Sequence, residues 1–291
     1  MSCVRHDNGT RFFFCTVIST ERSMIVPISQ ARLIVSINVF QNIDFMRDQL
    51  RNIDTYLDST LTWRPVLNCS AAFLEELKGT DLFQYCNPVT IDKQRFHGSI
   101  LNGIVSNMRY AMDNDDGVVF EWFLVMSART RFAHLLSEQN IYYTLQQYPK
   151  QPSFLWQNGW ATRDLKSWHW PRFTRTAISH SIDKRHHVGG MHEGLLLTRA
   201  ACNHIIQRMD LHGDAYDEDC PMEEWVLQSL STECGEPFLQ LSFRYDWFGT
   251  APLRIVDAPW KQTNQLIMGA IIAALLCICV IIVIVIVMVA R

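Results

Sequence analysis

The sequence lacks the short glycine-rich motifs that identify the commonest nucleotide-binding and ester-cleaving enzymes. Its 291 residues contain no P-loop, no GxGxxG and no GxSxG. Their absence argues against the common P-loop NTPase, Rossmann and α/β-hydrolase families. A large excess of one charge is also absent, because the formal net charge is only −3. The length allows one large domain or two small ones. Length and charge therefore leave the fold class open, and the order of the expected helices and strands has to indicate it.

The sequence also lacks a CxxC pair, although it contains nine cysteines. Two of them, Cys277 and Cys279, lie in an apolar stretch near the C-terminus. The others are Cys3, Cys15, Cys69, Cys86, Cys202, Cys220 and Cys234. An odd number without paired spacing favours reduced thiols in a cytosolic domain over a disulfide framework.

Charged side chains are absent from one long stretch, Leu266 to Ala290, which is rich in Ile and Val. At about 1.5 Å per residue, a helix of this stretch would reach about 37 Å, more than the roughly 30 Å hydrocarbon core of a bilayer. We therefore expect a single-pass membrane anchor over residues 265–291. Residues near the N-terminus show no apolar segment with a small-residue cleavage site, so we expect no signal peptide. A C-terminal span would be inserted after synthesis and would leave the domain on the cytosolic side.

The rest of the sequence alternates β-branched runs with segments of helical spacing, which predicts an α/β fold. The expected strands are Arg32–Val39, Pro65–Cys69, Phe120–Met126, Leu195–Thr198 and Phe238–Phe243. The expected helices are one capped by Asp44 and ending near Leu57, then Ala71–Leu77, Gly98–Met112, Arg199–Met209 and Met222–Leu230. Residues 140–190 are aromatic and are expected to be irregular. We thus divide the chain into an irregular lead-in (1–30), the α/β domain (31–250), a linker (251–264) and the anchor (265–291).

Histidines and aspartates offer two candidate metal sites. Six histidines lie close together in the second half of the sequence: His180, His186, His187, His192, His204 and His212. They lack the helical spacing of a zinc motif, and the spacings of Cys202, Cys220 and Cys234 are wide. The run Asp113, Asp115 and Asp116 resembles a DxD motif. It precedes a strand instead of ending one, which favours a solvated turn.

Carboxylates and cations give two further candidate sites. Glu223 and Glu224 open a helix just after Pro221, where a carboxylate benefits from the helix dipole and can act as a general base. Ordinary first-turn capping explains the same pair. Arg129 and Arg131 directly follow a central strand, at the edge where α/β sheets bind ligands. They could neutralise a diphosphate, or they could lie in a solvated loop.

Five segments together resemble the core-2/I-branching β-1,6-N-acetylglucosaminyltransferase and peptide-O-xylosyltransferase group, in its viral, algal or bacterial form. They occur in the family's order along residues 32–245. The segments are IVSINVFQNIDFMRDQLRNI, NPVTIDKQRFHGSILNGIVSNMRYAM, EWFLVMSARTRF, GGMHEGLLLTRAACNHII and DCPMEEWVLQSL. The resemblance implies a GT-A-like mixed sheet flanked by helices and an inverting, metal-independent glycosyltransferase. A C-terminal anchor departs from the animal members, which carry theirs at the N-terminus.

The resemblance also assigns roles to residues. Glu224 would be the catalytic base, with Glu223 beside it. Donor-binding positions would be Asn38, Val39 and Asn68 at the ends of the first two strands, with Arg129 and Arg131, or Arg244, Arg254 and Lys261, holding the diphosphate. Acceptor-binding positions would be His192 and Glu193, with Trp168, His169 and Trp170 as a sugar-stacking wall, although packed aromatics explain the tryptophans equally. No metal or other cofactor is implied.

The expected partners are a nucleotide-sugar donor, a glycan or glycoconjugate acceptor and a membrane, and no nucleic acid. Two other readings stay open. A tail-anchored adaptor could keep the fold and bind a partner or glycan without catalysis. A zinc-dependent hydrolase could use the histidines.

Overall fold

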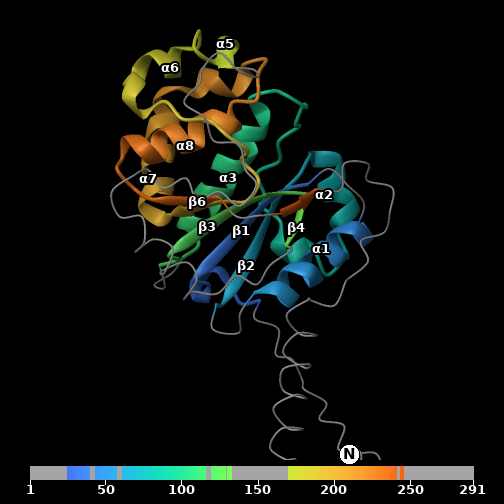
Figure 1. The fold of residues 1–291 in the computed structure, drawn as a ribbon. Helices are drawn as coiled ribbons and strands as arrows, with labels where there is room; N and C mark the ends of the chain where they lie inside the picture. The colour runs from blue at the N-terminus through green and yellow to red at the C-terminus, as the bar shows by residue number, and fades with distance from the viewer. Residues whose placement is uncertain are drawn as a thin grey trace, which may run out of the picture.

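The computed structural model describes residues 25–39, 43–57, 61–115, 119–128, 130–132, 170–240 and 243–245 (Figure 1). Several predictions fall outside these ranges: most of the lead-in, the linker and the anchor, and the residues Arg129, Trp168, His169, Arg254 and Lys261. In the part of the chain that is described, none of the helices has the length and apolar character that crossing a membrane requires.

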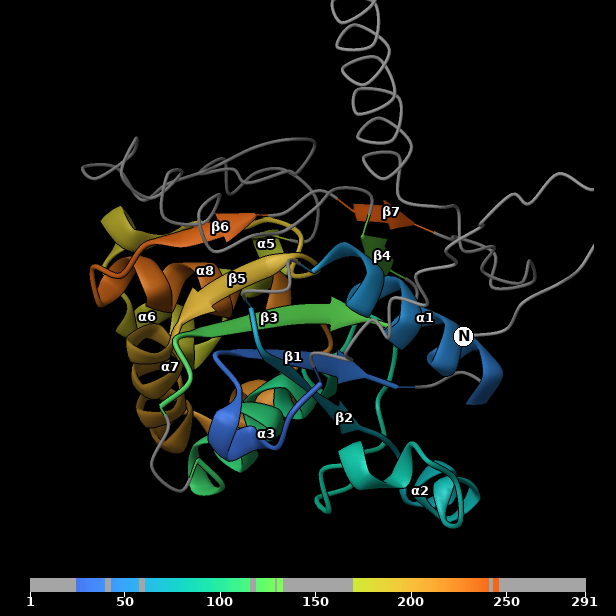
Figure 2. The same ribbon diagram turned by 90° about the horizontal axis from the view of Figure 1, so that it is seen from below.

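The centre of the molecule is a five-stranded mixed sheet in the order β2-β1-β3-β5-β6 (Figure 2). The strands are β1 (Leu33–Asn38), β2 (Trp63–Asn68), β3 (Trp122–Ser127), β5 (Leu195–Thr198) and β6 (Phe238–Gln240). The first three run parallel, and β5 is antiparallel to both of its neighbours. Pro65 lies in β2, an edge strand, where a missing backbone N–H is tolerated.

A second, two-stranded sheet pairs β4 (Thr130–Phe132) with β7 (Phe243–Tyr245). The prediction of one strand over Phe238–Phe243 is therefore wrong, because this stretch contributes to two different sheets. β6 extends the large sheet, whereas β7 pairs with β4, the short strand that follows β3 in the sequence. The pairing places the predicted cations Arg131 and Arg244 opposite each other in register.

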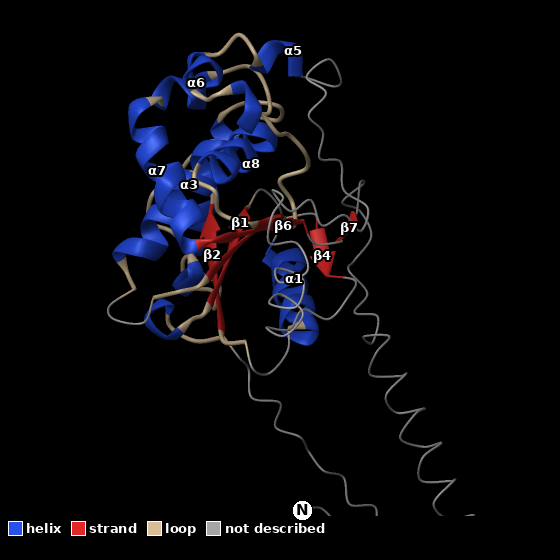
Figure 3. Ribbon diagram, turned by 60° about the vertical axis from the view of Figure 1, so that its left-hand side comes forward, coloured by secondary structure: helices blue, strands red, loops and turns tan. Residues whose placement is uncertain are grey.

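Helices cover both faces of the large sheet, with α3, α7 and α8 on one side and α1 on the other (Figure 3). Their bounds are α1 (Ile43–Tyr56), α2 (Ala71–Leu77), α3 (Ser99–Asp113), α5 (Trp170–Phe173), α6 (Ala177–Ser181), α7 (Arg199–Leu211) and α8 (Glu223–Glu233). Short 3-10 helices are η1 (Ile28–Gln30), η2 (Phe83–Tyr85), η3 (Lys184–His186) and η4 (Gly213–Asp217). The α/β fold with a mixed, helix-flanked sheet is thus confirmed.

The two faces of β1 divide the core between these helix layers. Ile34 belongs to the apolar cluster shared with α3, α7 and α8, whereas Leu33, Val35 and Ile37 belong to the cluster shared with α1. Side chains of a strand point alternately to opposite faces, so a continuous apolar run fits a strand buried on both sides. All six residues of β1 are buried.

Two local predictions need correction. Asp44 does not cap α1 but is its second residue and lies in its first turn. The helix dipole still stabilises a carboxylate at this position. The described part of residues 140–190 is not irregular, because it contains α5, α6 and η3. Side-chain caps support two of these short elements: Thr176 accepts from Ser179 N, and Asp183 accepts from Arg185 N.

Candidate functional site

The carboxyl ends of the three parallel strands lie level at one edge of the sheet. Asn38, the last residue of β1, is in register with Asn68 at the end of β2 and with Ser127 at the end of β3. Ligands of open α/β sheets bind outside this edge. The structure therefore brings the predicted donor positions Asn38, Val39 and Asn68 together, with Val39 N donating to Asn68 O at 2.8 Å.

The segment before β5 reaches the same edge from the opposite direction. Gly194 N donates to Val125 O at 2.8 Å, near the end of β3, and Leu195 N donates to His192 O at 3.1 Å. Gly194 has φ of +84°, a left-handed conformation that favours glycine at this turn. Because β5 is antiparallel to β3, its preceding residues His192 and Glu193 lie at the carboxyl edge.

The first turn of α8 adds two carboxylates to these residues. Gly190 N donates to the backbone oxygen of Glu224 at 2.8 Å. The side chain of Gln228, one turn further along α8, donates to Gly190 O at 3.2 Å and to Met191 O at 3.0 Å. These bonds hold the start of α8 against the segment that carries His192, so residues about thirty positions apart in the sequence face each other.

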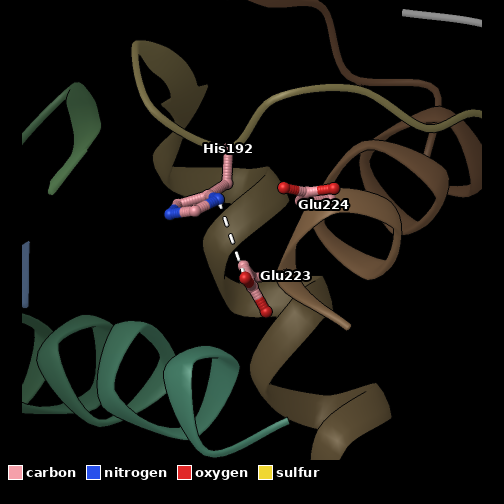
Figure 4. A group of neighbouring side chains, drawn as sticks. All are labelled: His192, Glu223 and Glu224. Carbon is pink, nitrogen blue, oxygen red and sulfur yellow. Dashed lines mark ion pairs between the residues drawn. The ribbon is translucent and has the colours of Figure 1, made fainter. Parts of the chain in front are cut away.

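His192, Glu223 and Glu224 point toward one another, as Figure 4 shows. His192 Nδ1 lies 3.8 Å from Glu223 Oε1 and 3.4 Å from Glu193 Oε2. The exposed fractions are 8% for His192, 9% for Glu193, 2% for Glu223 and 9% for Glu224. We call these four residues the carboxylate–histidine group. They form a nearly dry cluster of proton-accepting side chains at the sheet edge.

Burial controls the protonation of this group. It raises the pKa of Glu223 well above the ordinary value, and the neighbouring charges of Glu224 and Glu193 raise it further. Burial also lowers the pKa of His192, while Glu193 acts in the opposite direction. The uncharged forms of Glu223 and His192 are therefore favoured.

The two asparagines at the strand ends are tied into the fold by their amide groups. Asn38 Nδ2 donates to Ile100 O at 3.0 Å, and Asn68 Nδ2 donates to Val89 O at 2.9 Å. Both residues are buried. A Cβ on Gly103 would lie 2.4 Å from Asn38 Oδ1, so only glycine at this position of α3 lets the helix approach the strand end so closely.

Lys93 is a cation at this edge that no sequence motif indicated. Its Nζ donates to Asn68 O at 3.1 Å and to Ile91 O at 3.2 Å. Its Cε packs beside Gly103, close to Asn38. A single lysine in a polar loop has no pattern that distinguishes it, so its position depends on the fold.

We expect Lys93 to make the stability of the protein rise with pH. Desolvation lowers its pKa from 10.5 to about 8, so between these values the unfolded state binds more protons than the folded state. The unfolding free energy of the wild type, measured by urea unfolding, should rise relative to that of Lys93→Met by roughly 1–2 kcal/mol from pH 7.5 to 10.5. Partial exposure of the side chain reduces the full effect to this size.

Lys78→Met is the matched control, because Lys78 lies at the exposed end of α2. It makes the same chemical change without burial. A Lys93→Met difference that stays constant over this pH range would contradict the assignment.

Other predicted site residues lie apart from the carboxylate–histidine group. His204 Nε2 pairs with Glu233 Oε2 at 2.9 Å, and His187 Nε2 lies 3.0 Å from Ile182 O. Within the described ranges, His192 is the one histidine in a group that could hold a metal ion. The predicted cluster of histidines is therefore not one site.

The aspartate-rich turn after α3 differs from its prediction. Asp115 forms an ion pair with Arg199, whose guanidinium lies 4.8 Å from the ring of Phe120. The expected solvated turn is thus wrong at Asp115. The sequence pattern did not indicate its partner, because Arg199 follows β5 and is remote in sequence.

The described cysteines are free thiols: Cys69, Cys86, Cys202, Cys220 and Cys234.

Trp170 begins α5, and Arg131 and Arg244 lie in β4 and β7. The backbone positions of these three residues are described, and the other predicted cations fall outside the described ranges. The carboxylate–histidine group and the level strand ends therefore form the candidate functional site. Neither a protein-family model nor a curated protein matches the sequence.

Proposed function

We propose that the chain is an inverting glycosyltransferase that moves a sugar from a nucleotide-sugar donor, a UDP-sugar by preference, to a hydroxyl of a glycan or glycoconjugate. One observation supports this most directly: the sheet edge that carries Asn38 and Asn68 also carries Glu223 and Glu224. A transferase of this kind needs a nucleotide site and a carboxylate base at one edge. The five family-like segments of the sequence supply the rest of the case.

The reaction would proceed in one displacement. Glu224 takes the proton of an acceptor hydroxyl, whose oxygen attacks the anomeric carbon from the face opposite the nucleotide. The bond from that carbon to the diphosphate oxygen breaks, and the nucleoside diphosphate leaves with the electron pair. Cations fixed beforehand stabilise the charge that develops on it. Arg131 and Arg244, which β4 and β7 bring into register, would supply these cations. The sequence suggested two alternative sets of cations, and each set contributes one of these two arginines.

The choice of Glu224 over Glu223 as the base follows from accessibility and charge. Glu223 is 2% exposed against 9% for Glu224, and its environment favours the protonated form. A base has to be ionised and within reach of the acceptor. Glu193 and His192 lie beside it and would bind acceptor hydroxyls.

The membrane tether belongs to the same proposal. The apolar residues 265–291 would anchor the chain to a membrane with the domain on the cytosolic side, where nucleotide sugars are available. The resemblance to the glycosyltransferase group implies a transfer that requires no metal ion, and the sequence agrees with it in having no DxD motif at the end of an expected strand.

The test is a panel of UDP-, GDP- and CMP-sugars offered to the full chain in detergent, with EDTA present. A nucleotide that binds the folded state stabilises it by about 2.7 kcal/mol at a hundred times its Kd, so one nucleotide class should raise the melting temperature. The same class should release its nucleotide when acceptor glycans are added, which is UDP if the preferred donor is a UDP-sugar. Binding of no nucleotide, together with no turnover, would refute the enzyme and favour the adaptor.

A further inference from the structure

Two polar atoms in the carboxylate–histidine group have no hydrogen-bond partner among the described residues. They are His192 Nδ1 and Glu223 Oε2, on side chains that are 8% and 2% exposed. A buried polar atom without a partner costs about 1–3 kcal/mol. His192 comes from the segment before β5 and Glu223 from the first turn of α8, and Figure 4 shows the two side chains next to each other.

The charges around Glu223 have one sign. The charged side chains that act on it are Glu224 and Glu193, and no cation contributes among the described residues. Carboxylates buried together are costly unless a proton or a cation balances them. The neighbouring carboxylates therefore oppose the ionised form of Glu223, and a cation bound beside it would offset that effect.

The spacing of the group suits a single ion. One possible ligand atom from each of His192, Glu223 and Glu224 lies within 4.8 Å of the other two. Two atoms bound to one ion at about 2.0–2.2 Å lie roughly 3–4 Å apart. The 3.8 Å between His192 Nδ1 and Glu223 Oε1 falls within this range.

The chemistry of the ligand atoms selects the kind of ion. An imidazole nitrogen with carboxylate oxygens suits zinc and similar transition metals, whereas magnesium and calcium prefer oxygen alone. The bonds from Gln228 to the carbonyls of Gly190 and Met191 fix the two ligand-bearing segments relative to each other. A fixed site loses little entropy when the ion binds.

We propose that His192, Glu223 and Glu224 bind one divalent transition-metal ion, and that the bound ion inhibits the protein. The inhibition, but not the binding, rests on the proposed transferase function. A metal ion on Glu224 occupies the oxygen lone pair that would receive the acceptor proton. The transferase would then run in EDTA and be blocked by zinc.

Calorimetric titration of the chelator-treated full chain with zinc tests the binding. Wild type should bind one zinc ion per chain, and His192→Ala and Glu223→Gln should each weaken binding at least tenfold. His180→Ala and Glu76→Gln make matched changes at exposed positions and should leave the affinity unchanged. Magnesium should give no saturable heat.

Cobalt provides a second measurement that needs no variant. Cobalt(II) bound to wild type should show visible absorption bands of a nitrogen–oxygen site, and zinc should remove them. Absence of saturable zinc binding, or equal affinity in both site variants, would overturn the site. Zinc that binds without slowing transfer would overturn the inhibition alone, and a chain that binds zinc but transfers no sugar in EDTA would overturn the proposed function instead.

Discussion

Replacing Glu224 by Gln is expected to lower kcat of sugar transfer about a thousandfold and to leave the fold intact. General-base catalysis contributes typically 10²- to 10⁴-fold, and glutamine has the same shape but accepts no proton at neutral pH. The bond that Glu224 makes to Gly190 N uses its backbone oxygen, so the substitution keeps the contact between α8 and the segment before β5. The measurement is steady-state transfer with the nucleotide sugar selected by the panel.

The donor KM separates catalysis from binding in the same experiment. Because Glu224 would act on the acceptor proton, the KM for the donor should change less than threefold while kcat falls. Glu76→Gln on the exposed face of α2 is the matched control and should retain full activity. Glu223→Gln should lose less than Glu224→Gln, because Gln resembles the protonated form that burial favours at Glu223. The reverse order would assign the base to Glu223.

Elements with a strong local signal were predictable from the sequence. β1 combines a run of β-branched residues with burial on both faces, and the prediction over Arg32–Val39 contains the observed Leu33–Asn38. α2 was predicted with its observed bounds, and its N-cap Ser70 accepts from Phe73 N at 3.2 Å. In both cases the information lies within a few neighbouring residues.

Contacts between distant segments were not predictable in this way. The split of residues 238–245 between β6 and β7 depends on which partner strand each half meets, and neither partner is adjacent in sequence. The approach of His192 to Glu223 likewise depends on the turn at Gly194 and on Gln228. Family-like order could suggest that the two carry related roles, but only the fold gives the 3.8 Å between them.

A buried polar network holds α3 to the sheet behind the candidate site. Asn107 Nδ2 donates to Ser36 Oγ and to Val66 O, both at 3.0 Å. Its Oδ1 accepts from Asn87 Nδ2 at 3.1 Å, and Asn87 also donates to Ser106 Oγ at 2.9 Å. One side chain thereby joins β1, β2 and the loop that leads to Lys93.

Asn107→Ala is expected to lower the unfolding free energy by about 2–4 kcal/mol, because Val66 O and Asn87 Nδ2 lose a partner in a buried place. At about 2–4 °C per kcal/mol for a domain of this size, the melting temperature should fall by roughly 4–16 °C. Asn102→Ala is the matched control on the same helix: no side-chain hydrogen bond joins Asn102 to the described residues, so its melting temperature should shift by less than about 2 °C.

The network also predicts where the effect of Asn107→Ala spreads. Asn87 Oδ1 accepts from Val89 N at 2.9 Å, and Val89 O in turn holds the amide of Asn68 at the strand end. Loosening Asn87 should therefore weaken nucleotide binding at temperatures where the protein is still folded, which calorimetry with the selected nucleotide measures. Equal losses of stability in Asn107→Ala and Asn102→Ala would show that α3 is held by its apolar face alone. A large loss of stability with unchanged nucleotide affinity would show that the strand ends keep their shape without Asn87.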